Sequence, residues 1–135
     1  MQIESITLLS VNEASALPKE ILDCGHYYWL RSPGSDSSSA AFVDYGGYVL
    51  NFGYYVINYN YGVRPALVIP NLDSLNLRDF EEITMWDTKW IYIGKNMLFA
   101  KDIICERRFD ENSNVFEKSE IKEYLDNWLK EHLEN

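Results

Sequence analysis

The chain has 135 residues, of which 47% are hydrophobic and 24% charged, with a formal net charge of −9 at pH 7. The length and the hydrophobic fraction favour one globular domain and exclude a disordered chain. The negative net charge argues against nucleic-acid binding, which needs a cluster of basic residues. Neither a run of roughly 18 apolar residues nor a positively charged, apolar N-terminal segment occurs, so we expect a cytoplasmic protein without membrane contact, or one associated with a phage particle.

The first elements in chain order are a short strand and a capped helix. Residues 3–9 read as the strand, and Ser10 with Glu13 three positions later forms a capping-box pattern for a helix over 11–17. Pro18 suits the first position of a second helical turn. Glu13 has an alternative reading as a functional carboxylate, but the capping role is favoured.

The next segment holds Cys24 and His26, just before a strand predicted over 27–31. A Cys–His couple can make an activated thiolate, but no Asn or Asp at a recognisable spacing orients it. We favour a loop thiol and an exposed imidazole instead. Cys24 and Cys105 lie far apart and without metal-type spacing, so both are expected to be reduced thiols.

A meander of short antiparallel strands follows. Gly46-Gly47 is a hairpin signal, Gly53 predicts a bulge or turn, and Pro65 cannot donate to a strand ladder, which predicts an edge or bulge there. The predicted strands cover residues 40–45, 48–50, 54–58 and 63–69.

The second half of the chain begins after a polar joint over 71–80, so the expected single domain of residues 1–135 divides into 1–70, the joint and 81–135. Two paired strands over 83–86 and 90–93 are followed by a turn and a strand over 97–104. Ser119 then caps a helix whose apolar residues recur at helical spacing, which predicts that they pack in the core: Ile121, Tyr124, Leu125, Trp128 and Leu129.

The meander has the composition of a recognition surface. No Lys, Arg or Glu occurs between Arg31 and Arg64, while Tyr, Asn and Ser are abundant. Tyrosine gives rigid amphipathic contact area at low entropic cost, and Ser and Asn give adaptable hydrogen bonds. Because residues that flank turns stay accessible, we expect one ligand-binding patch together with the loop 35–39, formed by Tyr45, Tyr48, Asn51, Tyr59, Asn60 and Tyr61.

Arg31 and Arg64 stand at the two ends of this stretch, each close to a proline. They either converge on an anionic ligand or tie loops together through backbone carbonyls or a carboxylate such as Asp44. The structural role is favoured. With their neighbours these residues form the structural motif positions Trp29, Arg31, Pro33, Gly62, Arg64 and Pro65.

Three motifs carry a family resemblance: Leu8-Leu9-Ser10, the WLRSPG segment at 29–34 and the GVRPAL segment at 62–67. The chain resembles an uncharacterised family of bacterial and phage domains that looks like the C-type-lectin-like fold, in the variant shared with formylglycine-generating enzymes and phage tropism determinants. The resemblance implies an α+β fold with a twisted antiparallel core and two helices. The two halves stand in the reverse of the commoner order, as in a circular permutation.

The resemblance implies no settled activity. In phage tropism determinants a retroelement diversifies the corresponding surface and enriches Tyr, Asn, Ser and Asp; an ordinary fast-evolving face fits equally well. We expect a non-catalytic binding module for an unknown protein or glycan, with no metal and no cofactor, because convergent acid, base and nucleophile candidates are lacking. The alternative is an assembly subunit that buries its tyrosine face in an oligomer; the oligomeric state stays open.

Overall fold

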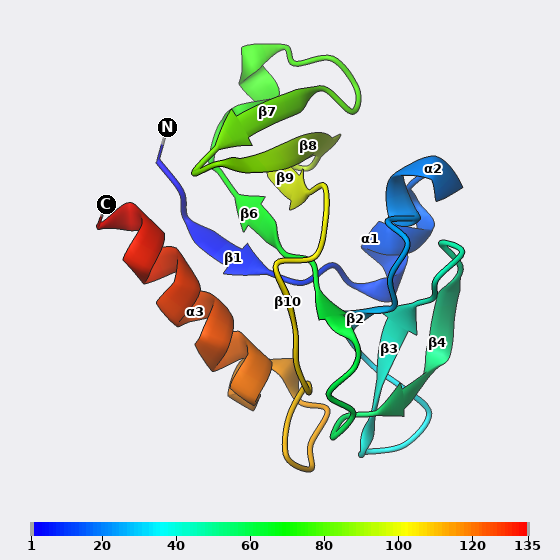
Figure 1. The fold of residues 1–135 in the computed structure, drawn as a ribbon. Helices are drawn as coiled ribbons and strands as arrows, with labels where there is room; N and C mark the ends of the chain where they lie inside the picture. The colour runs from blue at the N-terminus through cyan, green and yellow to red at the C-terminus, as the bar shows by residue number, and fades with distance from the viewer. Residues whose placement is uncertain (1, 135) are drawn as a thin grey trace.

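The computed structural model describes residues 2–134, which form an α+β arrangement of two five-stranded sheets and three α-helices (Figure 1). Sheet A has the strand order β1 (Ser5–Thr7), β6 (Ala66–Val68), β9 (Met97–Ala100), β8 (Thr88–Gly94) and β7 (Glu82–Met85). Sheet B has the order β10 (Cys105–Glu106), β5 (Gly62–Val63), β2 (Tyr28–Pro33), β3 (Ser39–Val43) and β4 (Val49–Tyr55). The helices are α1 (Val11–Ser15), α2 (Lys19–Leu22) and α3 (Glu120–Leu133), with 3-10 turns η1 (Leu72–Leu75) and η2 (Phe116–Lys118).

The predicted capping box is confirmed. The Ser10 hydroxyl accepts from the Glu13 backbone N–H, and the Glu13 carboxylate accepts from the Ser10 backbone N–H. The helix ends at Ser15 rather than at residue 17, and Pro18 precedes α2 as its N-cap. The preceding strand is also shorter than predicted, because only residues 5–7 pair with β6.

The predicted strand over 63–69 is wrong as a single element. The chain leaves sheet B after β5 and enters sheet A at β6, with Arg64 and Pro65 between them. Proline has no N–H to donate to either ladder, so the crossing can be made there without losing a backbone hydrogen bond. The GVRPAL segment is therefore the link between the two sheets.

The β3–β4 hairpin is longer and more regular than predicted. Residues 48–50 and 54–58 do not form two strands; β4 is continuous through Gly53, and the register shifts opposite residues 40–42 of β3. Gly53 has φ +86°, and a Cβ there would lie 2.6 Å from the carbonyl oxygen of Ala40. The predicted irregularity at Gly53 is confirmed, but as a bulge inside one strand.

The elements of the second half agree with their predicted order. Strands β7 and β8 pair through a two-residue turn in which Trp86 and Asp87 both have positive φ. Strand β9 ends at Ala100, four residues earlier than predicted. Ser119 is the N-cap of α3, where its hydroxyl accepts from the Lys122 backbone N–H.

The buried core draws on both halves of the chain. One cluster joins Ile6 and Trp29 to Trp90 and Leu125, while a second joins Tyr28 to Phe99. Helix α3 runs beside β1 at one flank of the molecule, while β3 and β4 lie at the other (Figure 1). The predicted joint over 71–80 contains η1, whose Leu72 is buried. This arrangement leaves one face of the β3–β4 hairpin far from the helix that covers β1.

Candidate functional site: an aromatic shelf on sheet B

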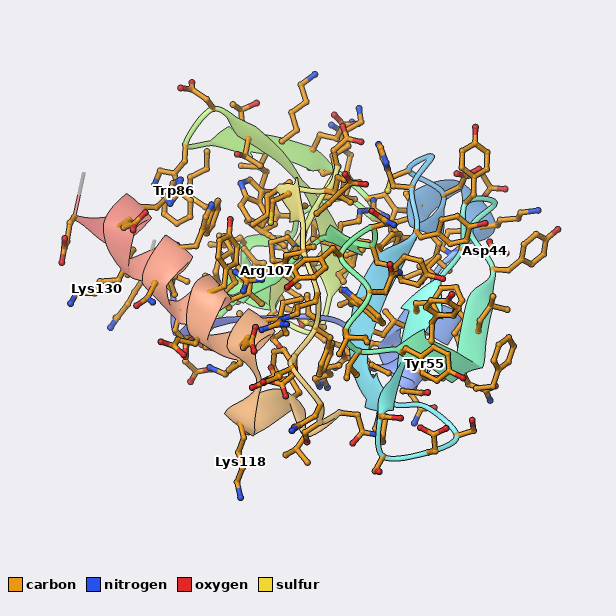
Figure 2. All side chains as sticks on the ribbon, turned by 60° about the horizontal axis from the view of Figure 1, so that its bottom comes forward. Asp44, Tyr55, Trp86, Arg107, Lys118 and Lys130 are labelled. Atoms are coloured by element: carbon orange, nitrogen blue, oxygen red, sulfur yellow. The ribbon has the colours of Figure 1, made fainter. Side chains whose placement is uncertain are left out.

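Exposed large hydrophobic side chains gather on one part of the molecule. Within residues 2–134, eight of the twelve such side chains come from positions 27–59, and seven of those eight are aromatic. Figure 2 shows Tyr55 and Asp44 at this end, away from Lys130 of α3. Large exposed apolar patches are uncommon on monomeric proteins, so the rings that contact one another in this region form the candidate site.

The centre of this region is a cluster that we call the aromatic shelf: Tyr27, Phe42, Phe52, Tyr54 and Tyr61. Phe42 of β3 is buried and forms the floor. The Tyr61 ring stacks on Tyr27 at 5.1 Å and on Tyr54 at 5.4 Å between ring centroids. Phe52 meets Phe42 edge-on at 6.4 Å. Half-exposed rings thus stand side by side over one buried ring.

The shelf is held from below by the WLRSPG strand. Trp29 is buried, its ring lies 4.8 Å from that of Tyr61, and its indole N–H donates to the carbonyl of Arg107. Phe109 packs edge-on against Trp29 from the opposite side at 5.7 Å. Because the supporting rings are fixed by packing and by a long-range hydrogen bond, the shelf is preorganised rather than assembled on contact with a ligand.

A shallow hollow of about 490 Å³ adjoins the shelf along residues 54–60. Tyr54 belongs to both features. The Asn58 side chain accepts from the Asn60 backbone N–H, and the Arg108 guanidinium lies 5.4 Å from the Tyr59 ring centroid. The hollow is lined by Tyr54, Tyr55, Ile57, Asn58, Tyr59 and Asn60.

The central hydroxyl of the shelf belongs to Tyr61. Burial, together with the neighbouring Tyr54, Tyr27 and Asp44, raises the pKa of Tyr61 to about 12. The hydroxyl therefore stays protonated and can donate. Together with the amides of Asn58 and Asn60, it supplies neutral donors and acceptors beside apolar rings. Such a surface suits an uncharged ligand with an apolar face and polar edges.

The structure brings some predicted site residues together and separates others. Tyr59, Asn60 and Tyr61 lie in or beside the hollow and shelf, with Tyr61 half-buried rather than exposed. Tyr45 and Tyr48 are exposed, but they stand at the turn that joins Val43 to Val49, at the opposite end of the hairpin from the Ser39–Tyr55 pair and the loop 35–39. At the turn, the Lys19 ammonium group contacts the Tyr48 hydroxyl at 2.6 Å.

The remaining predicted residue, Asn51, is exposed on β4. Reasoning from turns misses Tyr27, Phe52 and Tyr54, and the pairing of β3 with β4 in the structure explains the position of Tyr54. Ala40 and Phe42 are two residues apart on β3 and so share a face. Their partners on β4, Tyr54 and Leu50, lie on that same face, which is the face that carries the shelf.

The two motif arginines take structural partners. Arg31 binds both carboxylate oxygens of Glu13, at 2.6 and 3.1 Å, and donates to the carbonyl of Leu8. The favoured structural role of Arg31 is confirmed, but its carboxylate partner is Glu13 rather than Asp44, whose carboxylate accepts from backbone N–H groups of its own turn. WLRSPG therefore anchors α1 to β2, and Glu13 serves the helix cap and the ion pair together.

Arg64 is 2% exposed and bound to the backbone, as the favoured reading expected. It donates to the carbonyls of Ala100 and Leu22 and to the Tyr28 hydroxyl, at 2.8, 3.0 and 3.0 Å. Of the other motif positions, Pro33 ends β2, and Gly62 packs so closely that an added Cβ would lie 2.4 Å from Ile103. None of these residues belongs to the shelf.

Cys24 and Cys105 are free thiols, both half-buried. Burial raises the pKa of the Cys24 thiol, although the nearby Arg64 charge opposes that shift. Among residues 2–134, no three His, Cys, Asp or Glu side chains are grouped as a metal site would require. In the same part of the chain, no helix is both long and apolar enough to cross a membrane.

Comparison with known proteins adds one result. No curated protein and no solved structure matches the chain. Residues 6–71 contain all three motifs, the whole β3–β4 hairpin and the five residues of the aromatic shelf, whereas the supporting Phe109 lies outside them. These residues, 6–71, match the family of a domain of unknown function, DUF6273.

Proposed function

We propose that the chain is a non-catalytic binding module that captures a protein or glycan partner on the aromatic shelf and the adjoining hollow. The observation that carries this proposal is the cluster of exposed and half-exposed aromatic side chains around Tyr61, which packs on the buried Phe42 and Trp29 rings. Fully burying one large apolar side chain is worth about 1.5–3 kcal/mol. A partner that covers several of these half-exposed rings gains part of this free energy for each ring, and the fixed positions of the rings reduce the entropic cost of binding.

The chemistry of the face favours recognition over catalysis. Tyrosine, phenylalanine and asparagine side chains offer stacking and neutral hydrogen bonds, and they include no activated nucleophile with a neighbouring base. A sugar ring with an apolar face, or a protein loop with aliphatic and amide groups, complements such a surface. The two partner classes share the requirement for neutrality.

The proposal extends to the fold and origin of the chain. We infer a C-type-lectin-like architecture with its halves in permuted order, supported by the mainly antiparallel strand pairing, in which β2 and β5 pair in parallel, and by the positions of WLRSPG in β2 and GVRPAL across β5 and β6. We further infer that the chain is a phage or mobile-element product that acts in the cytoplasm or on a phage particle. The abundance of Tyr, Asn and Ser in the meander supports this origin. Retroelement diversification would be visible as a near-copy of this stretch beside the gene.

The test uses the intact chain against two defined probe sets, a printed glycan array and a displayed library of random peptides. The shelf variant Tyr27→Ser/Tyr54→Ser removes two exposed rings and leaves Phe42 and Trp29 in place. The matched control Leu75→Ser/Val115→Ser removes exposed apolar side chains outside the shelf. Binding by the wild type and the control, with loss in the shelf variant, is expected.

Selection of a glycan or of a peptide family identifies the partner class. Binding that survives in the shelf variant, or absence of any probe binding above background, contradicts the proposal. Circular dichroism and thermal unfolding of each variant establish that the fold is retained, because exposed-ring truncations leave the buried core intact.

A further inference from the structure

A pocket of about 240 Å³ lies between α2, strands β7 and β8, and the residues that follow β9. It shares no residue with the aromatic shelf or the hollow beside it. Ile21 of α2, Ile91 of β8 and the Cys24 side chain give it an apolar wall, and charged side chains line the rest. Sites for drug-sized ligands occupy roughly 300–1,000 Å³, so this pocket suits a smaller molecule.

The buried guanidinium of Arg64 forms the deep end of this pocket. Its Nε donates to the carbonyl of Ala100, and its Nη1 donates to the carbonyl of Leu22 and the hydroxyl of Tyr28. Within residues 2–134, no group accepts a hydrogen bond from the third nitrogen, Nη2. The one fully buried side-chain nitrogen or oxygen without a partner in this part of the chain is Nε of Arg107, so Nη2 of Arg64 is accessible from the pocket.

The charge of Arg64 has no carboxylate partner. Among the described residues 2–134, none of the ion pairs includes it. Buried charges in proteins are normally paired, because an unpaired charge away from water is costly. An N–H of a guanidinium makes its strongest hydrogen bond to an ionised acceptor. The free Nη2 group therefore favours a ligand that brings a carboxylate to the deep end of the pocket.

The mouth of the pocket has the opposite charge. Four carboxylate side chains and two cationic side chains line the pocket, so a simple inorganic anion would be repelled. Lys101 is already paired with Glu82 at 3.0 Å. Asp102 is exposed, and it belongs to none of the ion pairs within residues 2–134. A ligand that enters past Asp102 is therefore favoured if it also carries a positive charge.

The two opposite charges lie near one another in the pocket. Burial raises the pKa of the Cys24 thiol, while the Arg64 charge lowers it and the Asp102 charge raises it. Both charges thus act on the same sulfur atom, which itself lines the pocket. One small molecule with both a carboxylate and an ammonium group can therefore reach both of them.

We propose that this pocket binds a free aliphatic α-amino acid as its zwitterion. The ligand carboxylate accepts from Nη2 of Arg64, the ammonium group donates to the Asp102 carboxylate, and the aliphatic side chain contacts Ile21 and Ile91. Arg64 thereby serves the fold with two of its nitrogens and the ligand with the third. This site is separate from the partner-binding face proposed above and does not depend on it.

Isothermal titration calorimetry of the purified intact chain at pH 7 tests the requirement for both charges. The probes are L-leucine, leucinamide, which lacks the carboxylate, and N-acetyl-leucine, which lacks the ammonium group. L-Leucine is expected to bind, and each analogue is expected to bind at least about tenfold more weakly, because each leaves one charged group of the pocket unpaired. No binding of L-leucine up to about 20 mM, or equal binding of either analogue, overturns the proposal.

A variant at the mouth of the pocket locates the binding without disturbing the core. Asp102→Asn should weaken L-leucine binding by about tenfold, because the exposed carboxylate has no other partner to lose. Glu111→Gln is the matched control, since it removes an exposed carboxylate outside the pocket and should leave the affinity unchanged. Unchanged affinity in Asp102→Asn contradicts the proposal.

Nuclear magnetic resonance of the ¹⁵N-labelled chain gives the position of the ligand directly. Saturable shifts on addition of L-leucine are expected for the backbone amides of residues 20–24 and 101–102. Shifts confined to the aromatic shelf overturn the proposal. The shelf variant Tyr27→Ser/Tyr54→Ser should bind L-leucine like the wild type, so this proposal and that of the partner-binding face fail independently.

Discussion

The guanidinium carbon of Arg64 lies 4.0 Å from the centroid of the Phe99 ring, so a cation from the first half of the chain rests on an aromatic side chain from the second. Tyr28 lies near the same guanidinium, with its ring centroid 5.1 Å away. The acceptors around Arg64 are two backbone carbonyls and one hydroxyl. A buried charge is thus stabilised by dipoles and rings at the point where the chain passes between the sheets.

Replacing Arg64 with alanine should lower the free energy of unfolding by about 3–5 kcal/mol, because it opens a cavity and leaves buried acceptors unpaired. Urea denaturation at pH 7 measures the change. Arg78→Ala is the control, since that side chain is 87% exposed and should change stability by less than about 0.5 kcal/mol. A loss below about 1 kcal/mol for Arg64→Ala would contradict the structural role.

The Glu13 cap and ion pair should make stability depend on pH on the acid side. Partial burial acts to raise the pKa of Glu13, but hydrogen bonds from Arg31 and the Ser10 backbone, with the Arg31 charge, lower it below 4.5. The folded pKa is depressed, so the stabilisation is present above about pH 4.5 and is lost as pH falls through the folded value.

Glu13→Gln should therefore cost about 1–2 kcal/mol at pH 7 and much less at pH 3. Chemical denaturation of both proteins at the two pH values gives the comparison. Glu82→Gln removes an ion pair whose two side chains are both more than 40% exposed, and it should change stability by under about 1 kcal/mol at either pH. Equal losses for Glu13→Gln at both pH values would show that the charge is irrelevant.

Alkaline pH should destabilise the fold through its buried tyrosines. Burial raises the pKa of Tyr61 and of Tyr124 to about 12, and it also raises the pKa of Tyr28. Because these folded values exceed the unfolded value of 10.0, the stabilisation is complete below pH 10 and disappears as pH rises through 12. Absorbance of tyrosinate, followed together with circular dichroism, should show late ionisation that coincides with unfolding.

The two tyrosines at the ends of the sequence Tyr59-Asn60-Tyr61 should respond differently to truncation. Tyr61→Ala removes contacts with Trp29, Phe42 and Tyr54 and should cost about 2–4 kcal/mol. Tyr59→Ala removes a 61% exposed ring and should cost under about 1 kcal/mol. Thermal and urea unfolding measure both. If both substitutions lower the free energy of unfolding by similar amounts, Tyr61 of the shelf is no more tightly packed than Tyr59 of the hollow, and the prediction is wrong.

The sequence predicted those parts of the fold in which each residue's hydrogen-bond or strand partner lies within a few residues of it. The Ser10–Glu13 box and the Ser119 cap are satisfied inside one helical turn, and the β7–β8 hairpin closes over two residues. The crossing at Arg64 was beyond such reasoning, because its acceptors lie 36 and 42 residues away. Likewise, Arg31 pairs with Glu13 rather than with Asp44 because α1 packs against β2, and this packing could not be predicted from local sequence.

The candidate site could be predicted in composition but only partly in position. The absence of Lys, Arg and Glu and the abundance of Tyr pointed to the meander, which does carry the exposed rings. Which rings gather depends on the register of β3 with β4 and on the bulge at Gly53. That register places Tyr54 opposite Ala40, with its ring edge-on to Phe42 at 6.4 Å, and leaves Tyr45 at the far turn. Turn positions alone contain no such information.

The position of β6 bears on whether the matched region could fold alone. Strand β6 lies between β1 and β9, so a fragment ending at residue 71 would keep only a two-stranded remnant of sheet A. It would also lose Trp90, Phe99 and Leu125 from the packing around Trp29 and Tyr28. Two-stranded pieces with an open apolar face are marginal in water. We therefore expect a fragment of residues 6–71 to fold poorly by itself, because β1, β6 and the rings of Trp29 and Tyr28 pack against β8, β9 and α3.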